Sequence, residues 1–302
     1  MSLTSLEITA LESYRAGAAI APRSGDDIND WIRFGLHSLL QASASVRAAR
    51  LGASDVVLKS DGSPVTRLEL EIEERLAASL AAFAPDAALV GEETGGELLN
   101  RGWSVAVDPV DGTWAFVSGT ETFTTTLAIF RDGVPVLGLV SNPSTGELGY
   151  AAAGGATRLI QLSAFGEDDL ARALPMSGAD SGPILVNVHP GRRSGSLVAH
   201  LYDAWTNDRL RMVRSPGGSP AWALMEAARG SFVYVNLWSK RAASAYDLAS
   251  GCLLVQGAGG TVSDLDGSPI DLVSHAGPFV AAVDDDHRRL VTELVRAAAR
   301  EG

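Results

Sequence analysis

The sequence predicts a mixed α/β protein, with an α+β first half and a layered α/β second half. Three observations lead to this prediction. Amphipathic helix patterns come first, β-prone runs around tight turns follow up to about residue 140, and strand and helix patterns alternate beyond residue 183. Such alternation is typical of helices packed on a sheet. With 302 residues and 46% hydrophobic content, the chain can form one large domain or two lobes that share a cleft.

The first elements are expected to be helical. Residues 1–24 have a weak helical pattern and end in a loop-like stretch, so we interpret them as an N-terminal arm or a short extra helix. A helix is predicted from Asp26-Asp27 to about Leu51, because apolar residues recur there at three- and four-residue spacing. A second helix is predicted at about 66–83, before Pro85.

Short β-prone runs follow these helices. The runs at 88–90 and 104–107 each end in an acidic motif. Those at 122–130 and 134–140 flank the turn Arg131-Asp132-Gly133, which favours an antiparallel hairpin.

The second half alternates between strand and helix patterns. The predicted strands are 183–188 and 231–235, with a further hairpin around Asp266-Gly267. The predicted helices lie near 197–207, 221–228, 247–256 and 285–300. We therefore expect three parts, which are an arm (1–24), an N-terminal α+β lobe (25–155) and a C-terminal α/β lobe (156–302).

Charge and residue usage exclude several kinds of function. The chain has 24 Lys and Arg against 36 Asp and Glu, a formal net charge of −12, which argues against a nucleic-acid-binding surface. No apolar run has the roughly 18–20 residues of a membrane helix, and no secretory start is apparent. The single cysteine, Cys252, has apolar neighbours. These features predict a reduced, cytoplasmic protein.

Other binding signatures are missing from the sequence. Neither the Gly-rich loop of nucleotide triphosphatases nor that of dinucleotide-binding proteins occurs after a predicted strand. The five histidines are dispersed and lack the short spacing of a zinc site, so we interpret them as structural or surface residues. If a protein this acidic binds an anionic ligand such as a phosphate, it must recruit cations to its site.

The strongest chemical signal is a pair of aspartates three residues apart. The apolar run before Asp108 leads into Asp108-Pro109-Val110-Asp111-Gly112-Thr113, which predicts a Pro-containing turn that aims both carboxylates and the Val110 carbonyl at one point. Hard divalent cations prefer such oxygen ligands. An ordinary Asx/Pro turn is the alternative interpretation of this segment alone.

Two further acidic segments accompany this pair. Glu92-Glu93 follows another β-prone run, and Asp247 begins an apolar helix. Each has a plain structural alternative, namely a solvated loop for the glutamates and a helix N-cap for Asp247. Their combination with Asp108 and Asp111 favours a metal site over these alternatives.

Taken together, the motifs resemble those of the inositol monophosphatase superfamily. Three match its signature motifs, and two match its lysine loop and its closing hairpin. In chain order they are Lys59–Thr66, Gly91–Thr94, Asp108–Thr113, Tyr246–Gly251 and Gly259–Asp264. The resemblance spans about residues 27–297. It implies a layered αβαβα sugar-phosphatase fold with two lobes around a metal cleft, and a homodimer.

The resemblance assigns metal ligands residue by residue. Glu92, Asp108 and the Val110 carbonyl are implied to hold one Mg²⁺, while Asp108, Asp111 and Asp247 hold a second. Mn²⁺ is a possible substitute. Clustered cations of this kind cancel the charge of a phosphate dianion and stabilise the departing alkoxide.

The same resemblance assigns further roles. A third metal position is implied near Glu69, where family members commonly carry aspartate. Glu92 and Thr113 are implied to orient the attacking water, and the amides of Gly112 and Thr113 to cradle the phosphate. The loop at Gly217-Gly218-Ser219 is implied to line the substrate pocket. Lys59 could lie near the site, but a lone lysine in a loop usually points to solvent.

The implied leaving-group pocket departs from that of the inositol enzymes. Asn236 stands where those enzymes have an acidic residue, and the segment after it contains Lys240 and Arg241. Two cations would suit a second anionic group, although adjacent basic residues usually point to solvent. Ala115-Phe116 is closer to histidinol-phosphatase-like members.

We therefore predict Mg²⁺-dependent, lithium-sensitive hydrolysis of a small phosphorylated metabolite, without nucleic-acid or membrane partners. The open substrates are inositol phosphate, histidinol phosphate, a sugar bisphosphate and a 3′-phosphonucleotide. The alternative from another class is a catalytically silent family member that acts as a binding or regulatory protein.

Overall fold

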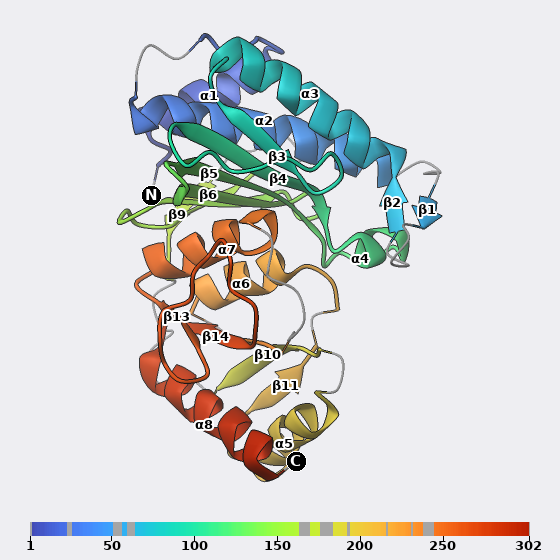
Figure 1. Cartoon of the computed structure of the whole chain (residues 1–302), viewed down its shortest axis with the longest axis vertical. Coiled ribbons are helices and arrows are strands. Elements are labelled where there is room, and N and C mark those ends of the chain that lie inside the picture. The colour runs from blue at the N-terminus through green and yellow to red at the C-terminus, as the bar shows by residue number, and fades with distance from the viewer. Residues whose placement is uncertain are drawn as a thin grey trace.

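The chain folds into five stacked layers, as shown by a computed structural model (Figure 1). Helices α1–α3 form one outer layer, a large sheet lies beneath them, α6 and α7 form the middle layer, and a smaller sheet and the helices α5 and α8 complete the stack. This confirms the predicted αβαβα fold. The structure describes residues 2–22, 26–50, 56–58, 64–162, 170–175, 184–191, 194–215, 217–230, 232–237 and 245–301.

The outer helical layer follows the sequence patterns closely. Helix α1 (Ser5–Arg15) occupies the segment predicted as an arm or short helix, and Thr4 and Glu7 form a capping box at its start. Helices α2 (Ile28–Arg50) and α3 (Arg67–Phe83) begin and end within one or two residues of the predicted bounds. Their apolar faces pack on the large sheet.

The large sheet has seven strands in the order β3-β4-β5-β6-β7-β8-β9. Only β3 and β4 run parallel; the other neighbours are antiparallel. The strands are β3 (Ala88–Gly91), β4 (Trp103–Asp111), β5 (Thr124–Arg131), β6 (Val134–Asn142), β7 (Glu147–Ala152), β8 (Arg158–Gln161) and β9 (Leu170–Ala173). The sequence did not indicate β7, β8 or β9. The lobe boundary at 155/156 stays a prediction.

Strand β4 extends further than predicted, and this positions the acidic motif. The expected turn from Asp108 is instead part of the strand, with a register irregularity between Asp108 and Asp111. Pro109 cannot donate a ladder hydrogen bond, and prolines in sheets are confined to such irregularities and to edges. The irregularity places two carboxylates and a peptide carbonyl within four residues.

The smaller sheet has the order β11-β10-β12-β14-β13. The first three of these strands are parallel, and β14 is antiparallel to both of its neighbours. The elements of this half are β10 (Leu185–His189), α5 (Gly195–Thr206), β11 (Met212–Arg214), α6 (Pro220–Ala228), β12 (Val233–Asn236), α7 (Ala245–Gly257), β13 (Thr261–Asp264), β14 (Phe279–Ala282) and α8 (Asp285–Glu301).

The two paired strands predicted around Asp266-Gly267 do not form. These residues form a turn with one isolated bridge, Ser263 to Pro269, and β13 pairs with β14 instead.

Two small elements complete the fold, namely the antiparallel pair β1 (Val56–Leu58) and β2 (Pro64–Thr66) and the short helix α4 (Thr113–Val117). Among the described helices, none is both long and apolar enough to cross a membrane.

Candidate functional site

Two buried aspartates lie at the carboxyl end of strand β4. The side chain of Asp108 is 2% exposed and that of Asp111 is 4% exposed. The Val110 amide donates to Asp108 Oδ1 at 2.8 Å, which folds the backbone around this carboxylate. Burial of two carboxylates is costly unless a cation or several donors compensate their charge.

Asp111 is held by groups from two distant segments. Its Oδ2 accepts a hydrogen bond from the Ala221 amide at 3.0 Å, from the Thr124 hydroxyl at 3.2 Å and from the Ser219 hydroxyl. Ser219 also caps α6, because its oxygen accepts from the Trp222 amide at 2.8 Å. The start of α6 is therefore attached directly to the acidic motif.

Gly112 permits this attachment. It has a φ of +90°, and a Cβ at this position would lie 2.7 Å from the Ser219 nitrogen. Gly218 is equally constrained, since its Cβ would lie 2.0 Å from the Thr122 carbonyl oxygen. Only glycine fits such close backbone approaches. The two predicted glycines thus lie side by side, on the acidic motif and on the predicted pocket loop.

The electrostatics of Asp111 are unfavourable to its charge. Burial raises the pKa of Asp111 to about 6, and the charge of the partly buried Glu92 adds to this effect. The hydrogen bonds from Ser219, Ala221 and Thr124 act in the opposite direction. A cation beside these carboxylates would reverse the shift, because an opposite charge favours the ionised form.

Thr113 and Glu69 also meet at this end of the sheet. Glu69, in the first turn of α3, is fully buried. The Thr113 hydroxyl lies 3.3 Å from Glu69 Oε1 and 3.1 Å from the Val110 carbonyl oxygen. A hydroxyl directed at a carboxylate keeps its oxygen lone pairs available to accept a hydrogen bond from a water molecule.

The predicted pocket residue Asn236 lies at the end of β12, is 6% exposed and is in register with His189. His189 Nε2 lies 3.0 Å from the Gly218 carbonyl, and the Tyr234 hydroxyl lies 3.3 Å from Nδ1. Burial lowers the pKa of His189 to about 4, so the ring is neutral and carries its proton on Nε2. This agrees with the structural role predicted for His189.

Four predicted site residues are not placed by these contacts. Lys59, Lys240 and Arg241 lie outside the described residues. Asp247 lies in the first turn of α7, but its side chain is outside the described part. Among the side chains that the structure describes, no group of three or more His, Cys, Asp or Glu residues is arranged to hold a metal ion.

The oxygen donors nevertheless fit a hard divalent cation. Asp108 and Asp111 are buried carboxylates of one strand, and the charge of Glu92 acts on Asp111. The three hydrogen-bond donors to Asp111 among the described residues are neutral groups, so none of these donors cancels its charge. Mg²⁺ prefers carboxylate oxygens as ligands, and its charge would offset the cost of ionising these carboxylates in a buried environment.

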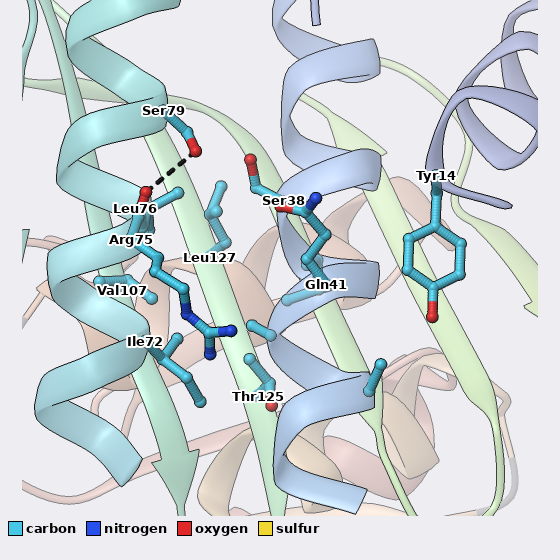
Figure 2. Close-up of a pocket in the computed structure, with 13 residues that line it drawn as sticks. Tyr14, Ser38, Gln41, Ile72, Arg75, Leu76, Ser79, Val107, Thr125 and Leu127 are labelled. Carbon is cyan, nitrogen blue, oxygen red and sulfur yellow. Dashed lines mark hydrogen bonds between the residues drawn. The ribbon is translucent and has the colours of Figure 1, made fainter. Parts of the chain in front are cut away.

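A cavity of about 260 Å³ lies on the opposite face of the sheet, between α2 and α3 (Figure 2). Ile72 and Arg75 of α3 face the same space as Val107 and Thr125 of the sheet. Consecutive side chains of a strand point to opposite faces of the sheet. Val107 lines this cavity, so the side chain of Asp108 points to the other face. The cavity is therefore not part of the candidate site.

Sequence reasoning missed several residues that act here. Thr124 and Ala221 hold Asp111 from 13 and 110 positions away, and no local pattern predicts such pairings. Ser219 was predicted to line the pocket, but its hydrogen bond to Asp111 was not. Glu73 was also missed. It is fully buried on α3 and accepts hydrogen bonds from the segment next to Glu92.

Comparisons with known proteins agree with this geometry. The sequence profile of the inositol monophosphatase family matches residues 31–301. A histidinol-phosphatase from Mycobacterium tuberculosis is 29% identical over 270 residues, 85% of this chain and 95% of its own. An inositol-1-monophosphatase from Mesorhizobium japonicum is 32% identical over 220 residues, 70% of this chain and 76% of its own. Among solved structures, the IMPase of Thermotoga maritima has a TM-score of 0.73 at 22% identity, over 90% of this chain and 99% of its own.

Proposed function

Because the chain belongs to the inositol monophosphatase family and is a phosphatase, we propose that it hydrolyses a small phosphate monoester with the help of Mg²⁺. Glu92, Asp108, Asp111, Asp247 and the Val110 carbonyl would hold the cations. The observation that carries this proposal is the buried pair Asp108 and Asp111, of which Asp111 receives neutral hydrogen-bond donors from the described residues and has a raised pKa. Bound Mg²⁺ would neutralise the phosphate dianion, acidify water and stabilise the departing alkoxide.

The chain's own residues would deliver the attacking water. The Thr113 oxygen accepts a hydrogen bond from that water, while the Thr113 proton is directed at Glu69 Oε1, 3.3 Å away. As water attacks phosphorus, its proton passes to the Thr113 oxygen and the hydroxyl proton moves toward Glu69. Glu69 therefore acts as proton acceptor, whether or not it also borders a third cation.

The phosphate itself would lie against the start of α4. Gly112 and Thr113 stand at the start of this helix, directly after Asp111, and backbone N–H groups are good donors to phosphate oxygens. Attack in line with the ester oxygen forms a new P–O bond to water and breaks the bond to the alcohol. The products are inorganic phosphate and the free alcohol, and no phosphorylated protein is formed.

Histidinol phosphate is the first candidate substrate. The histidinol-phosphatase of Mycobacterium tuberculosis aligns with this chain over nearly its whole length. The Ala115-Phe116 pair after the acidic motif supports the same choice. The uncharged Asn236 replaces the acidic acceptor expected of inositol enzymes, which weighs against inositol 1-phosphate.

A bisphosphate is the second candidate, and the sequence feature that favours it is Lys240-Arg241. Paired cations beside a phosphatase cleft would bind a second phosphate through charge-assisted hydrogen bonds. The variant Lys240→Ala/Arg241→Ala separates the two candidates. It should lose activity on bisphosphates and keep activity on histidinol phosphate.

The experiment is to measure phosphate release from histidinol phosphate, inositol 1-phosphate, fructose 1,6-bisphosphate and 3′-phosphoadenosine 5′-phosphate, each with Mg²⁺ and with excess EDTA. We expect release only with Mg²⁺, partial replacement by Mn²⁺, and inhibition by Ca²⁺ and Li⁺. Full activity in EDTA would overturn the metal-dependent mechanism. A homodimeric state and a cytoplasmic location remain predictions from the sequence.

A further inference from the structure

The turn that carries Glu92 has an unusually complete set of hydrogen bonds. Glu92 lies between β3 and Gly95, and its amide donates to the Val107 carbonyl at 3.2 Å, one residue before Asp108. Gly91 and Gly95 bond to each other in both directions, at 2.9 and 3.0 Å. Two amides of the turn, those of Glu93 and Thr94, find no acceptor within it and need one from elsewhere.

Glu73 supplies that acceptor from helix α3. Its Oε1 accepts from the Glu93 amide at 3.0 Å, and its Oε2 accepts from the Thr94 amide at 2.9 Å and from the Thr94 hydroxyl at 2.6 Å. The side chain is 0% exposed. All three of these donors come from the two residues that follow Glu92, so one buried carboxylate holds the far side of the turn.

Gly91 shows how closely the carboxylate approaches the backbone. A Cβ on Gly91 would lie 2.0 Å from Glu73 Oε2 and 2.6 Å from the Thr94 hydroxyl oxygen. Gly91 does not have the positive φ that usually requires glycine, so the constraint there is the approach of Glu73, whose carboxylate a side chain at this position would displace.

We propose that Glu73 is a positioning residue, which fixes the turn 91–95 so that Glu92 meets Asp108 and Asp111 in a cation-binding arrangement. This inference rests on the proposed function, because it concerns the binding of Mg²⁺. The turn is attached to α3 through Glu73 and to β4 through Val107, so the Glu92 backbone has two independent anchors. Residues that orient a metal ligand in this way typically contribute 10–100-fold to metal affinity.

The test measures Mg²⁺ binding by isothermal titration calorimetry, together with kcat at saturating Mg²⁺, in the parent and in Glu73→Gln. Glutamine has the same size, but its NH₂ group would face at least one backbone N–H, so donor meets donor and the turn is released. We expect the Mg²⁺ dissociation constant to rise roughly 10–100-fold, with a much smaller change in kcat. The matched control is Glu74→Gln, the next residue of α3, which is exposed and should bind Mg²⁺ as the parent does.

A second variant separates position from charge. Thr94→Val removes one donor and leaves the Glu73 charge intact, so a positioning role predicts weaker Mg²⁺ binding in Thr94→Val as well. It also predicts that the double variant is less affected than the two single effects combined. Normal Mg²⁺ binding in Glu73→Gln, or normal binding in Thr94→Val, would overturn the inference. The Thr94→Val result decides the question alone should Glu73→Gln not fold.

The role of Glu73 can fail while the proposed function stands. A parent protein that binds no Mg²⁺ overturns both the proposed function and the role of Glu73. A parent that binds Mg²⁺ tightly, with Glu73→Gln unchanged, overturns only the latter.

Discussion

Glu7 and Asp111 are both buried carboxylates, but the protein treats their charges in opposite ways. Glu7 on α1 is fully buried and lies 2.8 Å from the Arg158 guanidinium of β8, with further hydrogen bonds from Tyr150 and the Thr4 amide. Burial alone would raise the pKa of Glu7, but these partners outweigh it and hold the pKa below its usual value. Within the part of the chain that the structure describes, the donors to Asp111 are neutral, and its pKa is raised.

The difference shows which buried charge is compensated by the protein itself and which would be compensated by a bound ligand. At Glu7 the compensating cation is part of the fold, so burial of the pair joins α1 to the strands β7 and β8. At Asp111 the described residues supply neutral donors, and burial of the charge remains costly, as it often is in active sites. A bound cation would remove that cost.

The largest effect is expected from Asp111→Asn. Removal of this charge should lower kcat/KM by at least about a thousandfold, because metal ions supply several kcal/mol of transition-state stabilisation. The same substitution should leave the thermal stability of the metal-free protein equal or higher, since it removes a buried charge whose pKa is raised. Steady-state kinetics with Mg²⁺ and thermal melts in EDTA test the two halves.

Asp247→Asn serves as the companion variant for that experiment and should lose activity to a similar extent. Near-parental turnover in either variant with Mg²⁺ present would contradict the two-cation assignment.

Glu7→Gln should show the reverse pattern. It leaves the partly buried Arg158 without its counter-charge, and breaking a largely buried pair in this way costs about 3 kcal/mol. The activity per folded molecule should stay at the parental value, because α1 does not contribute to the candidate site. Urea unfolding measures the loss, with Arg67→Gln as control, since the exposed Arg67–Glu71 pair should be worth less than about 1 kcal/mol.

The pH dependence of stability sharpens the comparison further. The pKa of Glu7 is lowered on folding, so its contribution is present in full above the unfolded value of 4.5 and is lost as the pH falls through the lower folded value. Glu7→Gln should therefore lose less stability than the parent between about pH 6 and about pH 3. The test is the melting temperature of both proteins as a function of pH. An equal decrease in the two proteins over this range would show that the Glu7–Arg158 pair does not determine the acid sensitivity.

The smallest effect is expected from Tyr234→Phe. This variant removes the hydroxyl that lies 3.3 Å from His189 Nδ1 and keeps the ring in place. A neutral hydrogen bond of this length is worth about 1 kcal/mol or less, and the His189 contact to Gly218 remains. We expect a small decrease in melting temperature and activity within about fivefold of the parent. A loss of stability as large as that of Glu7→Gln would mean that the neutral Tyr234–His189 hydrogen bond stabilises the fold as strongly as an ion pair.

Local patterns predicted much of this fold, and their failures have physical causes. The amphipathic helices α2 and α3 were found within two residues, because burial of one face imposes the 3.6-residue period. Strands β8 and β9 were missed, since each is four residues long and lies toward the edge of the sheet, where the neighbouring strand supplies the pairing. The end of β4 was taken for a turn because Pro109 interrupts the strand pattern.

The candidate site was predictable in part. Two of its carboxylates, Asp108 and Asp111, stand in one short motif, so their spacing was visible in the sequence. The groups that hold them were not visible, because Ser219 and Thr124 approach through tertiary packing. Glu73 was not singled out, because nothing in the sequence distinguishes it from Glu71 and Glu74 on the same helix.

The middle helical layer has a consequence for how the molecule unfolds. Helices α6 and α7 share one hydrophobic core with both sheets, for example with Ala106 and Val140 of the large sheet and Tyr234 and Phe279 of the small one. Melting of either sheet would expose apolar surface that the other cannot cover. We therefore expect a single cooperative transition, and a chain cleaved between the sheets should yield no fragment that is stable by itself.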